Sequence, residues 1–202
     1  MKVTKQQAQA NRAHIVETAS ALFRERGYDG IGIAELMAAA GFTQGGFYKH
    51  FKSKADLMAE SSSSGIAQSA ALTAGASVPE FVNAYLSREH RDDRATGCTL
   101  AALCADAARK EDEVKAAFAA GIETQLAVLL NGAGELDEPG LADARAKYLA
   151  IMAHSLGAII LSRACPDDSP LADEILAACR DEILRAAGEV EPEGGRLDLA
   201  GA

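Results

Sequence analysis

The stretch TQGGFYKHF, residues 43–51, places two adjacent glycines at the start of a short helix-like segment and follows them with an aromatic pair, a lysine and a histidine. A glycine in a helix interior costs about 0.5–1 kcal/mol relative to alanine. Gly45 and Gly46 therefore weaken this segment. We expect the absence of their side chains to serve a purpose other than helix stability.

A longer amphipathic helix is predicted upstream of this stretch. Apolar residues between Ile15 and Phe23 recur at helical spacing and line one face. The helix is predicted to begin at Thr4, which forms a capping-box pattern with Gln7, or at Asn11. Gly27 is the residue type suited to its C-terminal end.

A second, shorter helix is predicted over residues 33–40, where Gly41 ends it. Thr43 is the expected N-cap of the third helix, so only a short glycine-containing turn separates the two. Two short helices joined in this way are typical of a helix-turn-helix, whose second helix enters the major groove of DNA. Without side chains at 45 and 46, the backbone could approach base edges and phosphates closely. The alternative interpretation is a flexible loop.

A fourth helix is predicted to begin after Phe51. Residues 53–56, SKAD, form an S-x-x-D capping box. Lys52 and Lys54 then lie at a helix N-terminus, where the helix dipole disfavours cations by about 0.3–1 kcal/mol. A bound phosphate would reverse that penalty, because backbone amides, dipole and lysine would converge on one anion. The alternative is that both lysines are simply solvated.

The formal net charge of -9 hides an uneven distribution. Residues 1–56 contain eight Lys or Arg and five Asp or Glu, whereas residues 57–202 contain twelve and twenty-four. A small basic end therefore precedes a large acidic body, which is compatible with a nucleic-acid partner for the basic end alone.

Residues 15–58, IVETASALFRERGYDGIGIAELMAAAGFTQGGFYKHFKSKADLM, resemble the DNA-binding domain of TetR-type (tetracycline-repressor-like) transcriptional regulators. The resemblance lies in the order and spacing of Gly27-Tyr28, Ala40-Gly41, Tyr48 and the ending from His50 to Lys54. It implies a double-stranded DNA operator as partner. The implied DNA-binding residues are Thr43, Gln44, Gly45, Gly46, Tyr48, Lys49 and Lys54.

Within that set, Gln44 is the predicted base-reading residue, because its amide can pair bidentately with adenine. His50 is expected to pack or cap, and the phenylalanines at 42, 47 and 51 to fill a small core. One departure from the family pattern is notable: Ile31 and Gly32 stand where the family usually has hydroxyl residues that cap the second helix and touch phosphate.

The composition, rich in alanine and leucine, predicts an all-α protein. We expect a three-helix helix-turn-helix DNA-binding domain over residues 1–56, a helical effector-binding and dimerisation domain over 57–190, and a disordered tail over 191–202. Ser61–Gly65 are expected to kink or fray the fourth helix, and Ser87–Gly97 to form a charged connection. Further helices are predicted to start at Val78-Pro79 and to span 98–109, 114–130, 141–165 and 170–188.

The last two helices, 141–165 and 170–188, are predicted to pair with those of a second copy in a homodimer, because the helix over 141–165 is apolar on most faces. A two-fold DNA site also needs two DNA-binding domains. The alternative is a bundle within one chain. An unknown small-molecule effector is expected to bind the body and release the operator. Candidate ligand contacts are Phe81, Tyr85, Cys98 and Phe118.

Two alternative functions remain open. Cys98 follows a charged segment containing His90 and Arg94, so it could act as a redox sensor; the ordinary alternative is a buried apolar cysteine. The second is an enzyme or small-molecule carrier without DNA binding, although no nucleophile–base or metal-ligand pattern is recognisable. We expect no enzymatic activity, no cofactor, no metal, no membrane partner and a cytoplasmic location.

Overall fold

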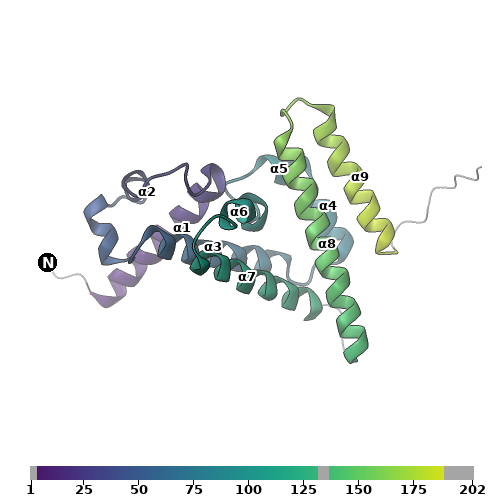
Figure 1. Ribbon diagram of the computed structural model, residues 1–202, viewed down its shortest axis with the longest axis horizontal. Helices are drawn as coiled ribbons and strands as arrows, with labels where there is room; N and C mark the ends of the chain where they lie inside the picture. The colour runs from purple at the N-terminus through teal and green to yellow at the C-terminus, as the bar shows by residue number, and fades with distance from the viewer. Residues whose placement is uncertain (1–3, 132–136, 189–202) are drawn as a thin grey trace, which may run out of the picture.

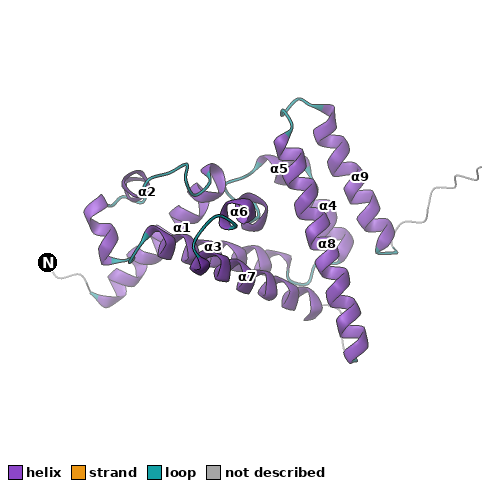
Figure 2. Cartoon of the chain, viewed as in Figure 1, coloured by secondary structure: helices purple, strands orange, loops and turns teal. Residues whose placement is uncertain are grey.

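The computed structural model describes residues 4–131 and 137–188, and every regular element within them is a helix (Figures 1 and 2). The all-α prediction is therefore confirmed. The helices, in chain order, are α1 (Lys5–Arg26), α2 (Ile33–Ala39), the 3₁₀ helix η1 (Gln44–Lys49), α3 (Lys54–Thr73), α4 (Val78–Tyr85), α5 (Arg88–Asp92), α6 (Thr99–Ala107), α7 (Asp112–Asn131), α8 (Glu138–Ala164) and α9 (Pro170–Ala186).

The molecule is elongated, with α2 at one end and the α8–α9 hairpin at the other (Figure 1). Helix α3 packs along α7 and also against α1, and α7 in turn contacts α8, so the α3–α7 pair connects the two ends. Helix α6 lies between them and contacts α1, α3, α7 and α8. We call residues 4–53 the reading head and residues 54–188 the body.

The helix starts follow local capping rules. The Thr4 hydroxyl accepts a hydrogen bond from the backbone N–H of Gln7 at 3.2 Å, which decides between the two predicted starts of α1. The Gln7 side chain donates to Asn11 Oδ1 instead of returning to Thr4, so the capping box is only half formed. At the start of α3, the Ser53 hydroxyl accepts from the Asp56 N–H at 3.0 Å, but the Asp56 carboxylate accepts from the Lys52 N–H rather than the Ser53 N–H, so this predicted capping box is also only half formed.

The predicted disruption of α3 at Ser61–Gly65 is wrong. The helix runs unbroken from Lys54 to Thr73, and Ser61 and Ser62 are each 1% exposed. Small side chains here allow close helix packing: a Cβ on Gly65 would lie 2.4 Å from Thr99 Oγ1 on α6. Across the neighbouring interface, a Cβ on Gly121 of α7 would lie 2.7 Å from Ile66. Tertiary packing thus overrides the low helix propensity of this segment.

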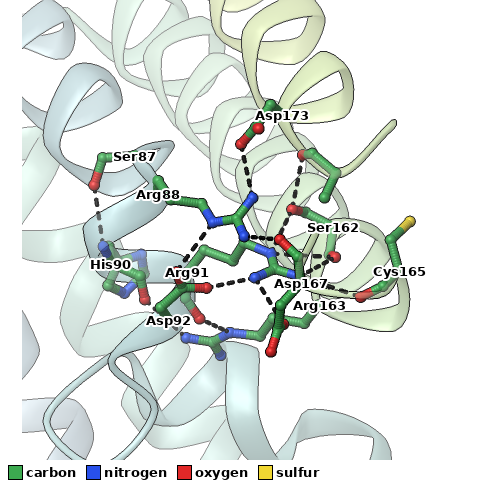
Figure 3. A network of polar contacts seen from close by, with 11 residues as sticks. Ser87, Arg88, His90, Arg91, Asp92, Ser162, Arg163, Cys165, Asp167 and Asp173 are labelled. Atoms are coloured by element: carbon green, nitrogen blue, oxygen red, sulfur yellow. Dashed lines mark hydrogen bonds and ion pairs between the residues drawn. The ribbon is translucent and has the colours of Figure 1, made fainter. Parts of the chain in front are cut away.

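The predicted charged connection over Ser87–Gly97 is also wrong in part, because it contains the short helix α5. Arg91 of α5 is 1% exposed and is the largest fully buried side chain in the described residues. It is surrounded by groups from the end of α8 and the α8–α9 turn (Figure 3). A charged residue is buried here because distant segments satisfy its donors.

Figure 3 shows how this buried network is satisfied. The Arg91 guanidinium donates to Ser162 Oγ at 3.0 Å, to the Ser162 carbonyl at 3.1 Å and to the Cys165 carbonyl at 3.2 Å. It also pairs with Asp167 at 3.1 Å. In the opposite direction, Arg163 of α8 donates to the Arg91 carbonyl at 2.8 Å. Helix α5 is therefore bound to the α8–α9 hairpin.

Helix α8 begins at Glu138 rather than near Leu141, because Asp137 caps it and Pro139 occupies its first turn. By length and composition alone, α8 is long and apolar enough to cross a membrane. Within the described chain, 22% of its apolar window is buried. Five of the seven large apolar side chains that are exposed in the described residues lie on α8 and α9: Leu141, Leu149, Ile160, Leu161 and Leu171. The predicted tail, residues 191–202, lies outside the described residues.

Candidate nucleic-acid interface and ligand cavity

The turn between α2 and η1 is set by one glycine. Gly41 has φ +79°, a conformation that favours glycine, and its N–H bonds to the Ala38 carbonyl at 3.0 Å. Phe42 N–H then returns to the Met37 carbonyl at 2.8 Å. The chain reverses within a few residues and leads directly into η1, as the helix-turn-helix prediction requires.

The second helix of this motif is a six-residue 3₁₀ helix rather than an α-helix, consistent with the low helix propensity of its two glycines. Thr43 occupies the N-cap position, but its side chain makes no capping bond. Phe47 is fully buried and Phe51 is 2% exposed, with their ring centroids 5.5 Å apart. This aromatic core fixes η1 against the rest of the reading head.

The opposite side of η1 faces outward. Thr43, Gln44, Gly45 and Lys49 are exposed, and Tyr48 is 70% exposed. Together with the half-buried Gly46, these residues form a continuous surface, which we call the recognition edge.

Neither glycine of the recognition edge is required by internal packing. A Cβ on Gly45 would have no atom within 4 Å, and one on Gly46 would only reach ordinary contact with Met37 at 3.7 Å. The internal packing of the described chain therefore provides no reason for glycine at 45 or 46, whereas an external surface that meets the backbone would.

Lys54, predicted to hold a phosphate, makes internal bonds. Its ammonium donates to the backbone carbonyls of Tyr28 and Ile31, the latter at 2.7 Å, and burial lowers its pKa. It thereby ties the start of α3 to the loop before α2. The Asp56 carboxylate accepts the Lys52 N–H at 2.9 Å, so an anion already lies at this helix N-terminus. A phosphate contact by Lys54 stays a prediction.

The structure also places Ile31 and Gly32, which depart from the family pattern, and His50, which was predicted to pack or cap. Ile31 is 2% exposed, and Gly32 caps α2 without any side-chain bond, so the hydroxyl contacts usual for the family are absent at these two positions. His50 is half-buried beside Phe42 and Phe51, with ring centroids 6.3 Å from each. This agrees with a packing role.

Contacts between the reading head and residues 95–110, which include α6, were not foreseen from the sequence. The Tyr28 N–H donates to Asp106 Oδ2 at 3.2 Å, and Arg24 Nε donates to the Ala95 carbonyl at 2.7 Å. Lys110 pairs with Asp29 at 2.6 Å, and that hydrogen bond lowers the pKa of Asp29. These pairs join residues more than 70 positions apart, so no local pattern could have indicated them.

Three of the four candidate ligand residues, Phe81, Tyr85 and Cys98, line one cavity of about 320 Å³ in the body. A second cavity of about 310 Å³ adjoins it, and both share Phe81 and Gln125 in their walls. The fourth candidate, Phe118, belongs to the buried core and lines neither cavity. Gln125 was missed, because it directly follows Glu123 and Thr124 in α7 and nothing in that local sequence indicates that its amide is buried.

The cysteines show little sign of an activated thiolate. Burial raises the pKa of Cys104 to about 11, which favours the thiol. Cys98 is 7% exposed, and its backbone N–H donates to His90 Nε2 at 3.3 Å. The redox alternative therefore gains no support from the geometry of these two residues.

The geometry is that of a helix-turn-helix DNA-binding domain carried on a larger helical body. Residues 15–61 match the family described as "Bacterial regulatory proteins, tetR family". The predicted resemblance to TetR-type regulators is therefore confirmed over these residues.

Individual relatives show the same similarity over part of the chain. The chain is 46% identical over 57 residues to the HTH-type transcriptional regulator AcrR of Shigella flexneri, covering 28% of this chain and 26% of that protein. It is 46% identical over 43 residues to the HTH-type transcriptional repressor DhaR of Mycobacterium sp. (strain GP1), covering 21% and 22%. The matched segments thus span about a quarter of these relatives.

The fold of the whole chain also has precedent. A TetR-family transcriptional regulator from Cytophaga hutchinsonii has a TM-score of 0.68 to this chain at 20% identity, covering 96% of this chain and all of that one. Its similarity extends through the helical body and shows a shared architecture.

Proposed function

We propose that this protein is a homodimeric repressor in the cytoplasm that binds a palindromic operator and leaves it when a small molecule occupies the body. The observation that carries the DNA-binding proposal is the recognition edge, an exposed surface whose bare glycine backbone nothing inside the described chain requires. The basic charge of residues 1–56 adds attraction to phosphate.

Dimerisation is supported by the α8–α9 hairpin. Leu149, Ile160 and Leu161 of α8 are 40%, 41% and 59% exposed, and Leu171 of α9 is 52% exposed. Apolar surface of this kind is characteristic of a face covered by another protein. A second copy on the same face would form an isologous interface and present two reading heads to one DNA duplex.

Release by a small molecule is supported by the position of the cavities. Their walls include the C-terminal end of α3, while the N-terminal end of α3 lies beside η1. A ligand that prefers one arrangement of the body would therefore change the placement of the reading heads, and a coupling free energy of about 1–3 kcal/mol is typical.

The test begins with selection of DNA from a random-sequence pool by the full-length protein at moderate salt, followed by anisotropy titration of the selected site. We expect a two-fold symmetric site whose half-sites lie about 10–10.5 base pairs, or a multiple, apart. Gly45→Val should weaken binding at least tenfold, and Gln44→Ala about tenfold, since a bidentate base contact contributes about 1–3 kcal/mol.

Gln68→Ala is the matched control, because Gln68 is an exposed glutamine of α3 away from the recognition edge. It should bind like the original protein. Selection of sites without any sequence preference, or equal losses in Gln44→Ala and Gln68→Ala, would refute the proposal.

A further inference from the structure

Two residues that line the adjoining cavities of the body have buried polar atoms without a hydrogen-bond partner in the described chain. Among the described residues, Tyr85 Oη and Gln125 Oε1 are buried and have no hydrogen-bond partner, and both residues line the 320 Å³ cavity. Buried polar groups are nearly always satisfied in folded proteins, so each such exception requires an explanation. A bound molecule in the cavity would supply one.

The chemistry of these atoms restricts that molecule. Gln125 Oε1 can only accept a hydrogen bond, so it requires a donor. Burial and the neighbouring Cys98 thiol raise the pKa of Tyr85 well above its usual value, so its hydroxyl stays protonated and can both donate and accept. Phe81 and Tyr85 are stacked, with centroids 5.1 Å apart, and give the cavity an aromatic wall.

The charges around the two cavities further restrict the molecule that they can bind. The charged or titratable side chains of the two linings, besides Cys98 and the tyrosines 85 and 148, are Glu80 and His90. The Glu80 carboxylate is exposed and accepts bonds from the Ser77 N–H and hydroxyl at the start of α4. A charged ligand would therefore meet no buried opposite charge here.

His90 does not provide that charge either. Its Nδ1 lies 2.7 Å from the Tyr85 carbonyl, which can only accept, and its Nε2 lies 3.3 Å from the Cys98 N–H, which can only donate. The ring is therefore the neutral Nδ1–H tautomer with both nitrogens engaged, and burial lowers its pKa.

We propose that these cavities bind an uncharged, largely aromatic small molecule that donates a hydrogen bond to Gln125 Oε1 and contacts the Tyr85 hydroxyl, as a phenol or a primary carboxamide would. This inference rests on the proposed function, in which the body holds the effector site. It adds the chemical class of the effector and the two residues that select it.

The test compares three probes of one shape. Calorimetric titration of the full-length protein at pH 7 with 2-naphthol, naphthalene and 2-naphthoate separates a neutral donor, a molecule without a donor and an anion. We expect 2-naphthol to bind at least tenfold more tightly than either of the others. Equal binding of 2-naphthol and naphthalene, tighter binding of the anion, or no binding of 2-naphthol would overturn the inference.

Variants locate the preference. Gln125→Met and Tyr85→Phe should each reduce the preference for 2-naphthol over naphthalene at least threefold. Ser155→Ala is the matched control, because Ser155 Oγ is also buried and unpaired in the described chain but lines neither cavity. A preference unchanged in both cavity variants, or lowered equally by Ser155→Ala, contradicts the assignment.

The two proposals fail separately. Titration with the probes needs no DNA, and the DNA selection needs no ligand. Absence of probe binding with sequence-specific DNA binding intact removes this inference alone. Probe selectivity with no DNA specificity removes the proposed operator function and leaves the ligand class standing.

Discussion

Gly45 of the reading head and Gly65 of the body lie in opposite environments, and buried polar side chains are concentrated in the body. In the reading head, Gly45 has open space where a Cβ would lie, whereas in the body Gly65 has three side-chain atoms within 2.8 Å of that position. Of the eight buried polar or charged residues among those described, only Ser20 lies in the reading head. The reading head thus has an apolar core and an exposed glycine edge, whereas the body is a close-packed bundle whose mainly apolar core also contains buried polar groups.

This difference indicates where substitutions affect stability and where they affect binding alone. In the reading head, Gly45 and Gly46 of the recognition edge face outward. In the body, Gly65 and Arg91 lie where helices pack together, and Gln125 lines a cavity. Paired substitutions, one in each kind of environment, test that division.

The largest stability effect is expected for Arg91→Met. Loss of the guanidinium removes the donor to the Cys165 carbonyl and to the Ser162 hydroxyl oxygen, whereas the Ser162 carbonyl keeps the Cys165 N–H; each unsatisfied buried group costs about 1–3 kcal/mol. We expect the free energy of unfolding, measured in urea, to fall by about 3 kcal/mol. Arg91→Lys should lie between, because one ammonium cannot replace the planar fork.

Arg94→Met serves as the control for this substitution, since Arg94 is exposed three residues further along. It should change the free energy of unfolding by less than about 0.5 kcal/mol. Similar losses for Arg91→Met and Arg94→Met would show that the buried network contributes nothing particular to the body.

A smaller loss is expected for Gly65→Ala. The added methyl group would meet Thr99 Oγ1 at 2.4 Å and Ser20 Oγ at 2.7 Å, so these side chains or α3 itself must shift. Overpacking of this kind costs about 1–3 kcal/mol. Chemical denaturation measures it directly.

Gly46→Ala in the reading head is the matching substitution, because its Cβ reaches only ordinary contact distances of 3.7 and 3.9 Å. It should leave stability within about 0.5 kcal/mol of the original or raise it slightly. If the two alanine variants unfolded at the same denaturant concentration, the contrast between reading head and body would be lost.

The smallest effect concerns pH and His90. Burial lowers the pKa of His90 in the folded protein, so the unfolded chain binds this proton more readily. Protonation therefore favours unfolding. Stability should decline as pH falls below about 6.5, the ordinary histidine value, and stop declining below the folded pKa. Urea unfolding between pH 8 and pH 5 gives this profile.

The variant His90→Gln should flatten this part of the pH profile. His14→Gln should not, because His14 is exposed on α1 of the reading head. An identical pH dependence in the original protein and His90→Gln would remove His90 as its source.

The sequence predicted the reading head closely because its signals are local. Ser53 caps α3 through a residue three positions away, and Gly41 and Gly27 end helices through their own positive φ angles. The buried positions of Phe47 and Phe51 follow from their spacing around the exposed edge. Short-range rules of this kind need no knowledge of the rest of the chain.

The body was less predictable because its decisive contacts are long-range. A charged segment such as Ser87–Gly97 indicates exposure unless its partner is known, and the partners of Arg91 lie 71 to 76 positions further along. Likewise, Ser61 to Gly65 weaken an isolated helix but suit a helix that α1, α6 and α7 approach closely. For the cavity, the sequence suggested Phe81, Tyr85 and Cys98 but not Gln125 or His90.

Helix α3 joins the reading head to the cavity of the body as one continuous helix. It begins at Lys54, whose ammonium is anchored beneath the reading head, and ends at Thr73 in the cavity wall. Its 20 residues span about 30 Å, so a tilt of only about 5° at one end displaces the other by about 2.6 Å. A hydrogen bond to a base edge does not survive a shift of that size. Under the proposed function, a ligand of only a few rings that tilts α3 by this angle would therefore release the protein from DNA.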